Sequence, residues 1–271
     1  MCRRCVHGTA AGPSCPVCIR SRPKNTQSHS HAGSPRQEQQ KVHPPIVTLL
    51  VAATCLAIFG YDWQRLQAFV FGTGPVNING EIVEQLGELT LYAPIVQAEG
   101  EWFRVVTSGF VHFGWTHLAM NMILLVLAGR LIEGRYGALA FSTIYIAGLL
   151  GGSLGAVLLD YDSQVGGASG AIFALLGSLA VLQKMAGGQL LRTGIGPLLV
   201  VNVALSFLPD VSLGGHLGGL AAGVLAGLVI GSAQRLGPRA LTAAPVVVAA
   251  LGFALFVAVI PAIDWAVTQA S

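Results

Sequence analysis

The chain has 271 residues, of which 53% are hydrophobic and only 10% charged, and its formal net charge is +3. Soluble domains carry about 25% charged residues because their surface must be solvated. The composition therefore excludes an ordinary soluble enzyme, a disordered protein and a nucleic-acid-binding protein with a broad basic face. It predicts instead that most of the chain lies in a lipid bilayer.

The first segment is rich in cysteine. Four of the five cysteines form two Cys-x-x-Cys pairs: Cys2, Cys5, Cys15 and Cys18. A cytoplasmic location disfavours disulfides, so this spacing predicts a structural zinc knuckle over residues 1–20, in which His7 could replace one ligand. The nine residues between the pairs are fewer than in the usual zinc ribbon. Reduced thiols in a disordered tail are the alternative.

Residues 21–43 are rich in Ser, Gln, His and Pro, which is typical of a flexible linker. The leading 41 residues do not fit a signal peptide, because the first apolar run begins too far from Met1. We interpret that run as a signal anchor.

Seven segments lack charge over roughly the 20 residues that are needed to cross a bilayer. Charged residues bound them at 41–62, 104–130, 135–160, 162–184, 192–210, 210–235 and 239–264. The fifth is the shortest. Residues 66–80 are also uncharged, but two Gly-containing turns argue against a span there. The sequence thus predicts an all-α membrane protein with seven spans.

The charges also predict an orientation. With the N-terminus in the cytoplasm, 13 of the 15 basic residues lie on the cytoplasmic side, all but Arg65 and Arg104. Ten of the 12 acidic residues then lie outside, all but Glu38 and Glu133. An N-in, C-out topology follows.

Polar residues inside the predicted spans are few, and each is costly unless it has a partner. The shortlist of candidates is His112, His117, Asn121, Ser169, Asn202 and His216. At about 1.5 Å per residue, Ser169 and His216 lie roughly 10 Å below the outer surface, and His117 and Asn121 lie at a similar depth. Asn202 is interpreted as structural, and His112 as either a loop anchor or an auxiliary oxyanion-site residue.

Stripes of small residues predict which helices touch, because small side chains allow close approach in lipid. One stripe follows His216 in its span: Gly219, Gly223 and Gly227. The other lies in the span of Ser169: Gly166, Gly170, Ala174 and Ser178. Packing of the two stripes would bring Ser169 near His216, with Phe173 one turn below the serine.

A serine within hydrogen-bond reach of a neutral histidine is an activated nucleophile. No acidic residue lies deep in a predicted span, so a Ser169–His216 dyad is the largest catalytic set predicted. The developing oxyanion would need donors, for which His117, Asn121 and the Ser169 backbone N–H are candidates. Each motif alone has a simpler explanation: helix packing for Gly-x-Ser-Gly and interhelical hydrogen bonding for the histidines and Asn121.

Five segments in this order resemble those of the rhomboid intramembrane serine proteases. They are residues 100–112 (GEWFRVVTSGFVH), 117–121 (HLAMN), 133–137 (EGRYG), 167–170 (GASG) and 215–219 (GHLGG). The resemblance covers roughly residues 45–235. Phe173 stands where some members carry tyrosine.

The resemblance implies a six-helix core over residues 44–236 and an additional C-terminal helix over 240–264. It implies that Ser169 is the nucleophile and His216 the general base and acid. His117, Asn121 and the Ser169 amide would form the oxyanion site, with no cofactor for catalysis.

The resemblance further implies that the loop 63–110 is half-embedded in the outer leaflet, that Arg104 bonds loop backbone, and that the fifth span is a lateral gate. The expected substrates are single-pass membrane proteins, and the expected location is the inner membrane of a bacterium with a cytoplasmic N-terminus. A catalytically silent rhomboid-like protein that binds transmembrane helices for quality control is the alternative. A small transporter is disfavoured because no deep acid is present.

Overall fold

The computed structural model describes residues 7–9, 12–14, 43–70, 89–192, 194–209 and 211–270. The chain divides into two compact units, Met1–Gln40 and Lys41–Ser271. In the first, strands β1 (His7–Thr9) and β2 (Gly12–Ser14) form an antiparallel hairpin. The predicted zinc ligands lie outside the described residues: Cys2, Cys5, Cys15 and Cys18. The predicted linker lies outside them too, except for its last residue, His43.

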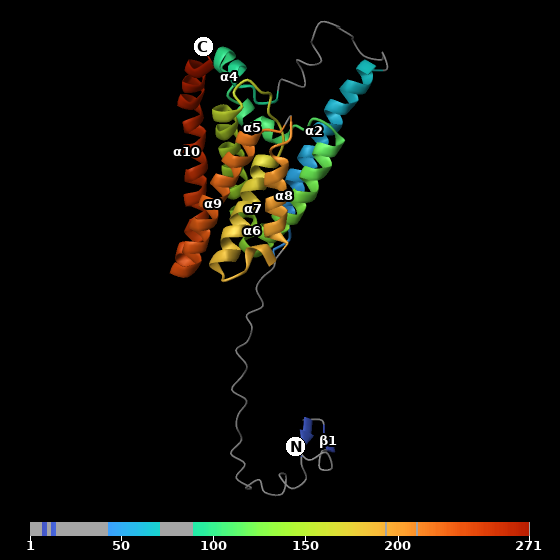
Figure 1. Ribbon diagram of the computed structural model, residues 1–271, viewed down its shortest axis with the longest axis vertical. Helices are drawn as coiled ribbons and strands as arrows, with labels where there is room; N and C mark the ends of the chain where they lie inside the picture. Colours follow the sequence, from blue (N-terminus) through green and yellow to red (C-terminus); the bar gives the residue numbers. More distant parts are fainter. Residues whose placement is uncertain are drawn as a thin grey trace. The chain divides into compact units, whose positions relative to one another are not determined.

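In the described part of the second unit, the regular secondary structure consists of helices and one isolated bridge, between Leu91 and Val165. Its helices run roughly along one direction (Figure 1). In chain order they are α2 (Ile46–Val70), α4 (Ala93–Glu99), α5 (Arg104–Thr107), η1 (Ser108–Phe110), α6 (Trp115–Leu159), α7 (Ser169–Met185), η2 (Leu190–Arg192), α8 (Ile195–Leu205), α9 (Leu213–Leu236) and α10 (Pro238–Ala270).

Helix α6 contains a reversal at Gly137. Its 45 residues would extend about 67 Å as a straight helix, more than twice the thickness of the hydrocarbon core. Gly137 has φ 85° and ψ 171°, which is not helical and favours glycine. The chain folds back there, since a Cβ added to Gly129 would lie 3.0 Å from the Phe141 ring. The reversal falls two residues beyond the predicted break between residues 130 and 135.

Two predicted boundaries are wrong. Helix α2 continues to Val70, so residues 63–70 are helical and not part of a loop. No glycine or proline occurs between Gly60 and Gly72 to end the helix earlier. The second predicted span begins at Trp115 and not after Arg104. Gly114, at φ 133°, separates it from the short helices α5 and η1. His112 therefore lies in the loop before α6 and not within a span.

A buried carboxylate ties α2 to α6. The Glu133 side chain is only 1% exposed, and its oxygens accept hydrogen bonds from Val47 N (2.9 Å), Thr48 N (2.8 Å) and Thr48 Oγ1 (2.7 Å). The first backbone N–H groups of a helix have no partner within it, and a carboxylate there also interacts favourably with the helix dipole. Glu133 therefore satisfies the N-terminus of α2.

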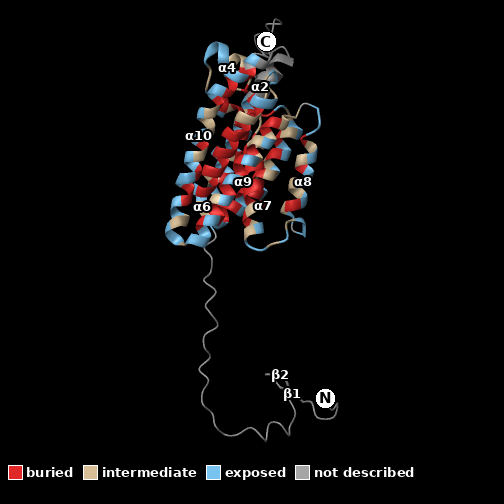
Figure 2. Cartoon of the chain, turned by 60° about the vertical axis from the view of Figure 1, so that its left-hand side comes forward, coloured by how far each residue is buried: buried red, intermediate tan, exposed pale blue. Residues whose placement is uncertain are grey.

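Helix α9 packs against α7, α6 and α10, whereas α8 packs against α7 and η2. Buried residues gather on the inner faces of α6, α7 and α9 (Figure 2). Only two residues of α8 are buried, Gly196 and Asn202. At 11 residues α8 is also short, as predicted for the fifth span.

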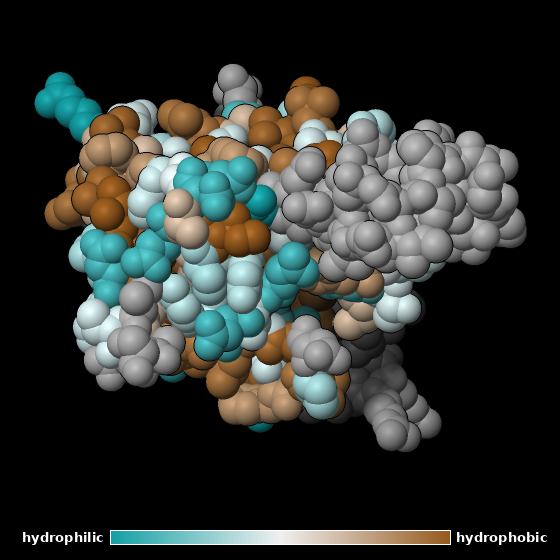
Figure 3. All heavy atoms as spheres, turned by 90° about the horizontal axis from the view of Figure 1, so that it is seen from above, coloured by the Kyte–Doolittle hydropathy of each residue, from teal (hydrophilic) through white to brown (hydrophobic). Residues whose placement is uncertain are grey.

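Large apolar side chains face outward along the bundle, Phe253 and Val246 of α10 among them, each 68% exposed. Hydrophilic residues gather within the face seen from the α4 end, and hydrophobic residues lie around much of its edge (Figure 3). Among the described residues, α6, α9 and α10 are long and apolar enough to cross a membrane by length and composition. Apolar surface of this extent is unusual in soluble monomers and is what a bilayer would cover.

Candidate active site

The site begins where α7 and α9 make their closest approach. A Cβ added to Gly219 would overlap the carbonyl oxygen of Gly170, and one added to Gly223 would overlap the backbone of Ala174. The two small-residue stripes therefore pack backbone to backbone, as predicted. This contact brings together the first turns of α7 and α9, which carry Ser169 and His216.

Ser169 is the first residue of α7 and follows a turn that only glycine fits well. Gly167 has φ 129°, and a Cβ there would lie 2.7 Å from His117 Nε2. The backbone N–H of Gly167 donates to the Ser108 carbonyl at 2.9 Å. The turn that presents Ser169 is thus fixed from one side by η1 and lies against the His117 ring on the other.

His216 is held in the first turn of α9 by a cap and by ring stacking. The N-cap residue Ser212 accepts from Gly215 N at 2.9 Å, and Asp160 Oδ2 accepts from Ser212 Oγ (2.6 Å) and Gly214 N (2.9 Å). The Phe173 ring stacks on the imidazole with centroids 4.3 Å apart and an interplanar angle of 18°. Phe173, predicted to lie one turn below Ser169, therefore packs on the His216 ring.

His117 and Asn121 lie on one face of α6. The Asn121 Nδ2 donates to the His117 carbonyl at 2.9 Å, which leaves its second amide N–H for another acceptor. The His117 Nδ1 accepts a long hydrogen bond from Phe113 N at 3.5 Å. In the neutral ring the proton then resides on Nε2, the atom that faces the turn before Ser169.

His112 lies beside these groups, with its ring centroid 5.2 Å from that of His117. Its Nδ1 donates to the Phe110 carbonyl at 3.2 Å, while Nε2 is buried without a hydrogen-bond partner in the described part of the chain. Burial, and secondarily the nearby His117, lowers the pKa of His112 to about 4. The ring is therefore neutral at pH 7.

One cavity of about 490 Å³ joins these groups. Its lining includes all four predicted catalytic residues: His117, Asn121, Ser169 and His216. No hydrogen bond joins the Ser169 hydroxyl to the His216 ring, both of which are described. Such contacts are often long in a free enzyme and shorten when substrate binds.

The His216 ring also contacts a hydroxyl group that the sequence analysis did not single out, that of Ser206. Ser206, the C-cap of α8, places its Oγ 2.6 Å from His216 Nδ1 and 2.9 Å from the Asn202 carbonyl oxygen. Ser206 is 2% exposed. It lies ten residues before His216, near the end of the predicted fifth span, and belongs to no motif, so only its low exposure distinguishes it. Asn202 lines the same cavity.

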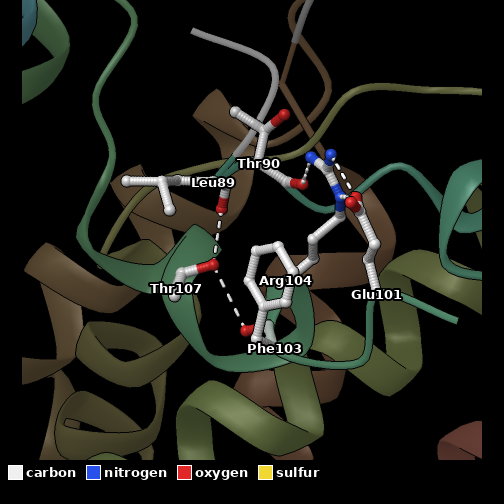
Figure 4. Close-up of polar contacts among 6 residues, drawn as sticks. All are labelled: Leu89, Thr90, Glu101, Phe103, Arg104 and Thr107. Atoms are coloured by element: carbon white, nitrogen blue, oxygen red, sulfur yellow. Dashed lines mark hydrogen bonds and ion pairs between the residues drawn. The ribbon is translucent and has the colours of Figure 1, made fainter. Parts of the chain in front are cut away.

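The segment before α6 is fastened by side-chain bonds to backbone, as the polar contacts in Figure 4 show. Arg104 Nη1 donates to the Thr90 carbonyl at 3.2 Å and Nε to Glu101 Oε2 at 2.6 Å. Thr107 Oγ1 bonds the Leu89 carbonyl at 2.9 Å. Arg104 thus bonds loop backbone as expected, and the bridge from Leu91 to Val165 links this segment to the loop before Ser169.

Histidine, cysteine and carboxylate side chains are the usual metal ligands in proteins. Within the ranges that the structure describes, His, Cys, Asp and Glu form no group of three able to hold a metal ion.

The chain is similar to proteins of one family. A family model described as "Rhomboid domain" matches residues 99–233. These residues form a rhomboid domain. Rhomboid protease GluP of Bacillus subtilis is 33% identical over 202 residues, which is 72% of this chain and 39% of that protein. RHOMBOID-like protein 5 of Arabidopsis thaliana is 35% identical over 141 residues, 49% of this chain and 45% of that protein.

Rhomboid-related protein 3 of Homo sapiens is 28% identical over 206 residues, 69% of this chain and 48% of that protein. The chain therefore spans about two fifths to one half of the length of these curated relatives. The rhomboid relatives and the long apolar helices together make this an integral membrane protein that contains a rhomboid domain.

Proposed function

We propose that this protein is an intramembrane serine endopeptidase that cleaves single-pass membrane proteins in or near their transmembrane segments. One observation carries the proposal: Ser169 and His216, in the first turns of two helices packed backbone to backbone, line one cavity with His117 and Asn121. The name of the Bacillus relative, a rhomboid protease, supports the same chemistry.

In the proposed mechanism, the Ser169 Oγ attacks the scissile carbonyl carbon while its proton passes to His216 Nε2. The carbonyl oxygen becomes an oxyanion, for which His117 Nε2–H, the free amide N–H of Asn121 and the Ser169 backbone N–H are the donors. One such donor typically contributes about 3–4 kcal/mol to lowering the barrier. Collapse breaks the C–N bond, and His216 returns the proton to the leaving amine.

Water then hydrolyses the acyl-enzyme by the same steps in reverse, with His216 taking a proton from water and the carboxyl product leaving Ser169. The stacked Phe173 ring limits rotation of the imidazole, which favours one geometry through both half-reactions. A substrate helix must unwind near the cavity to expose a carbonyl, so helix-destabilising residues are expected close to the cleaved bond.

We further propose seven spans, with an N-in, C-out orientation in a bacterial inner membrane. The charge distribution supports this topology, with 13 of 15 basic residues on the cytoplasmic side. The active site would then open toward the outer leaflet.

The test uses the full-length protein in detergent with a model single-pass substrate. Ser169→Ala and His216→Ala should each abolish cleavage, and a fluorophosphonate probe should label wild type but not Ser169→Ala. The matched control is Ser178→Ala, which removes a buried serine of α7 whose hydroxyl donates to the Gly223 carbonyl. Full activity in either site variant would refute the assignment. Substrate capture without cleavage or labelling in wild type would favour the silent, helix-binding alternative.

A further inference from the structure

Ser206 is placed to control the protonation pattern of His216. It is the C-cap of α8, and its Oγ lies within hydrogen-bond distance of two groups, His216 Nδ1 at 2.6 Å and the Asn202 carbonyl oxygen at 2.9 Å. At 2% exposure its hydroxyl is shielded from solvent. The direction of each bond follows from the chemistry of these atoms.

A serine hydroxyl has one proton to donate and two lone pairs that accept. The Asn202 carbonyl can only accept, so the Ser206 proton must lie between these two oxygens. The 2.6 Å contact with His216 then needs its proton from the ring, which makes Nδ1–H the donor and Ser206 Oγ the acceptor. A neutral imidazole with its proton on Nδ1 has an unprotonated Nε2.

The acceptor oxygen is itself held in place. The Asn202 carbonyl also accepts from Ser206 N at 3.1 Å, and the Asn202 side chain donates to the Leu198 carbonyl at 2.8 Å. Both bonds belong to α8, so the Ser206 hydroxyl keeps a fixed direction relative to that helix.

Within the described part of the chain, no carboxylate bonds His216 Nδ1. Asp160 lies against the beginning of α9, the helix whose first turn carries His216. The Asp160 Oδ2, however, accepts from Ser212 Oγ and Gly214 N. Ser206 is the side chain that hydrogen-bonds the His216 ring within the described part of the chain.

We propose that Ser206 is a positioning residue that fixes His216 in the Nδ1–H tautomer and so leaves Nε2 free to take the proton of Ser169. This inference rests on the proposed proteolytic function. The bond persists when His216 becomes an imidazolium, because Nδ1–H donates in both protonation states. Since Ser206 closes α8, a displacement of that peripheral helix would release the ring.

The test compares Ser206→Ala with Ser206→Thr, which keeps the hydroxyl. One hydrogen bond contributes about 0.5–1.5 kcal/mol net, so at about 1.4 kcal/mol per decade kcat should fall about 2- to 12-fold in Ser206→Ala. KM should be unchanged and Ser206→Thr should recover most of kcat. Ser178→Ala is the control, since it removes a buried hydroxyl that also donates to a backbone carbonyl but lies away from His216.

A second readout does not depend on proteolysis. The ring ¹⁵N resonances of His216, assigned by comparison with His216→Gln, should report protonated Nδ1 in wild type and a mixture of tautomers in Ser206→Ala. Unchanged resonances, or a fall in activity confined to KM, would overturn the proposal. Should wild type prove inactive while the tautomer still changes in Ser206→Ala, the proposed function fails and the positioning by Ser206 stands.

Discussion

The carboxylate of Asp160 ties the end of α6 to the beginning of α9, and its removal should destabilise the active-site end of the protein. Asp160 Oδ2 accepts from Ser212 Oγ at 2.6 Å and from Gly214 N at 2.9 Å. Ser212 in turn caps α9 through Gly215 N. Replacement by alanine removes both bonds to the carboxylate and frees the capping serine to rotate.

Hydrogen bonds to charged groups contribute about 1.5–3 kcal/mol each, and loss of an N-cap interaction costs about 0.5–2 kcal/mol. Asp160 is half-buried, so the lower part of these ranges applies. We expect Asp160→Ala to lower the free energy of unfolding by about 2–3 kcal/mol. Asp160→Asn keeps an acceptor oxygen and loses only the charge near the positive end of α9, about 0.3–1 kcal/mol.

Unfolding in mixed detergent micelles would measure these differences, with Asp162→Ala as the control because Asp162 is exposed and its change should stay within about 0.5 kcal/mol. The rate at which a fluorophosphonate labels Ser169 should fall in Asp160→Ala under conditions where the variant is folded, because the first turn of α9 carries His216. An Asp160→Ala protein as stable as Asp162→Ala would refute the reasoning.

Three further predictions concern other parts of the chain. Glu133→Gln should destabilise the protein by about 2–4 kcal/mol in the same unfolding assay, because an amide N–H₂ must then face a backbone donor of α2; a loss below about 0.5 kcal/mol would contradict this. Gly219→Ala should cost about 1–3 kcal/mol and slow labelling of Ser169, since the new Cβ meets the Gly170 backbone. Gly60→Ala is its control, because a Cβ added there meets only open space, and it should raise the free energy of unfolding by up to about 1 kcal/mol. Equal effects on stability at the two glycines would refute the close packing of α7 and α9. Full-length protein should bind stoichiometric zinc that is lost when Cys2, Cys5, Cys15 and Cys18 become serine, and metal analysis showing less than a stoichiometric amount would end that hypothesis.

The sequence predicted the close approach of α7 and α9 because the signal is local. Glycines and alanines at every fourth position of a helix form one smooth stripe, and such a stripe has few uses other than close packing. Gly219 and Gly223 therefore identified the contact, and with it the proximity of Ser169 and His216. Phe173 followed from the same periodicity, one turn below Ser169.

Other features required the three-dimensional arrangement. The end of α2 was missed by eight residues (70 against 62) and the start of α6 by ten (115 against 105), since charged residues mark membrane edges and not helix ends. Ser206 and Asp160 carry no signal in the sequence, because a lone polar residue near the end of an apolar segment resembles any other. Their partners are 10 and 52 to 54 residues away in the chain.

The sequence alone predicted that most of the chain lies in a bilayer, because the charged fraction of 10% is a property of the chain itself. It also predicted that Ser169 and His216 lie close together, because polar residues and small-residue stripes within apolar segments can be read directly from the chain. Only the tertiary structure decided how His216 is oriented. A hydrogen bond depends on positions to within a few tenths of an ångström, and the 2.6 Å contact with Ser206 exists only once the C-terminal end of α8 lies beside the first turn of α9. The groups around His216 thus include the neutral hydroxyl of Ser206, whereas the sequence, with no acidic residue deep in a predicted span, predicted a dyad of Ser169 and His216.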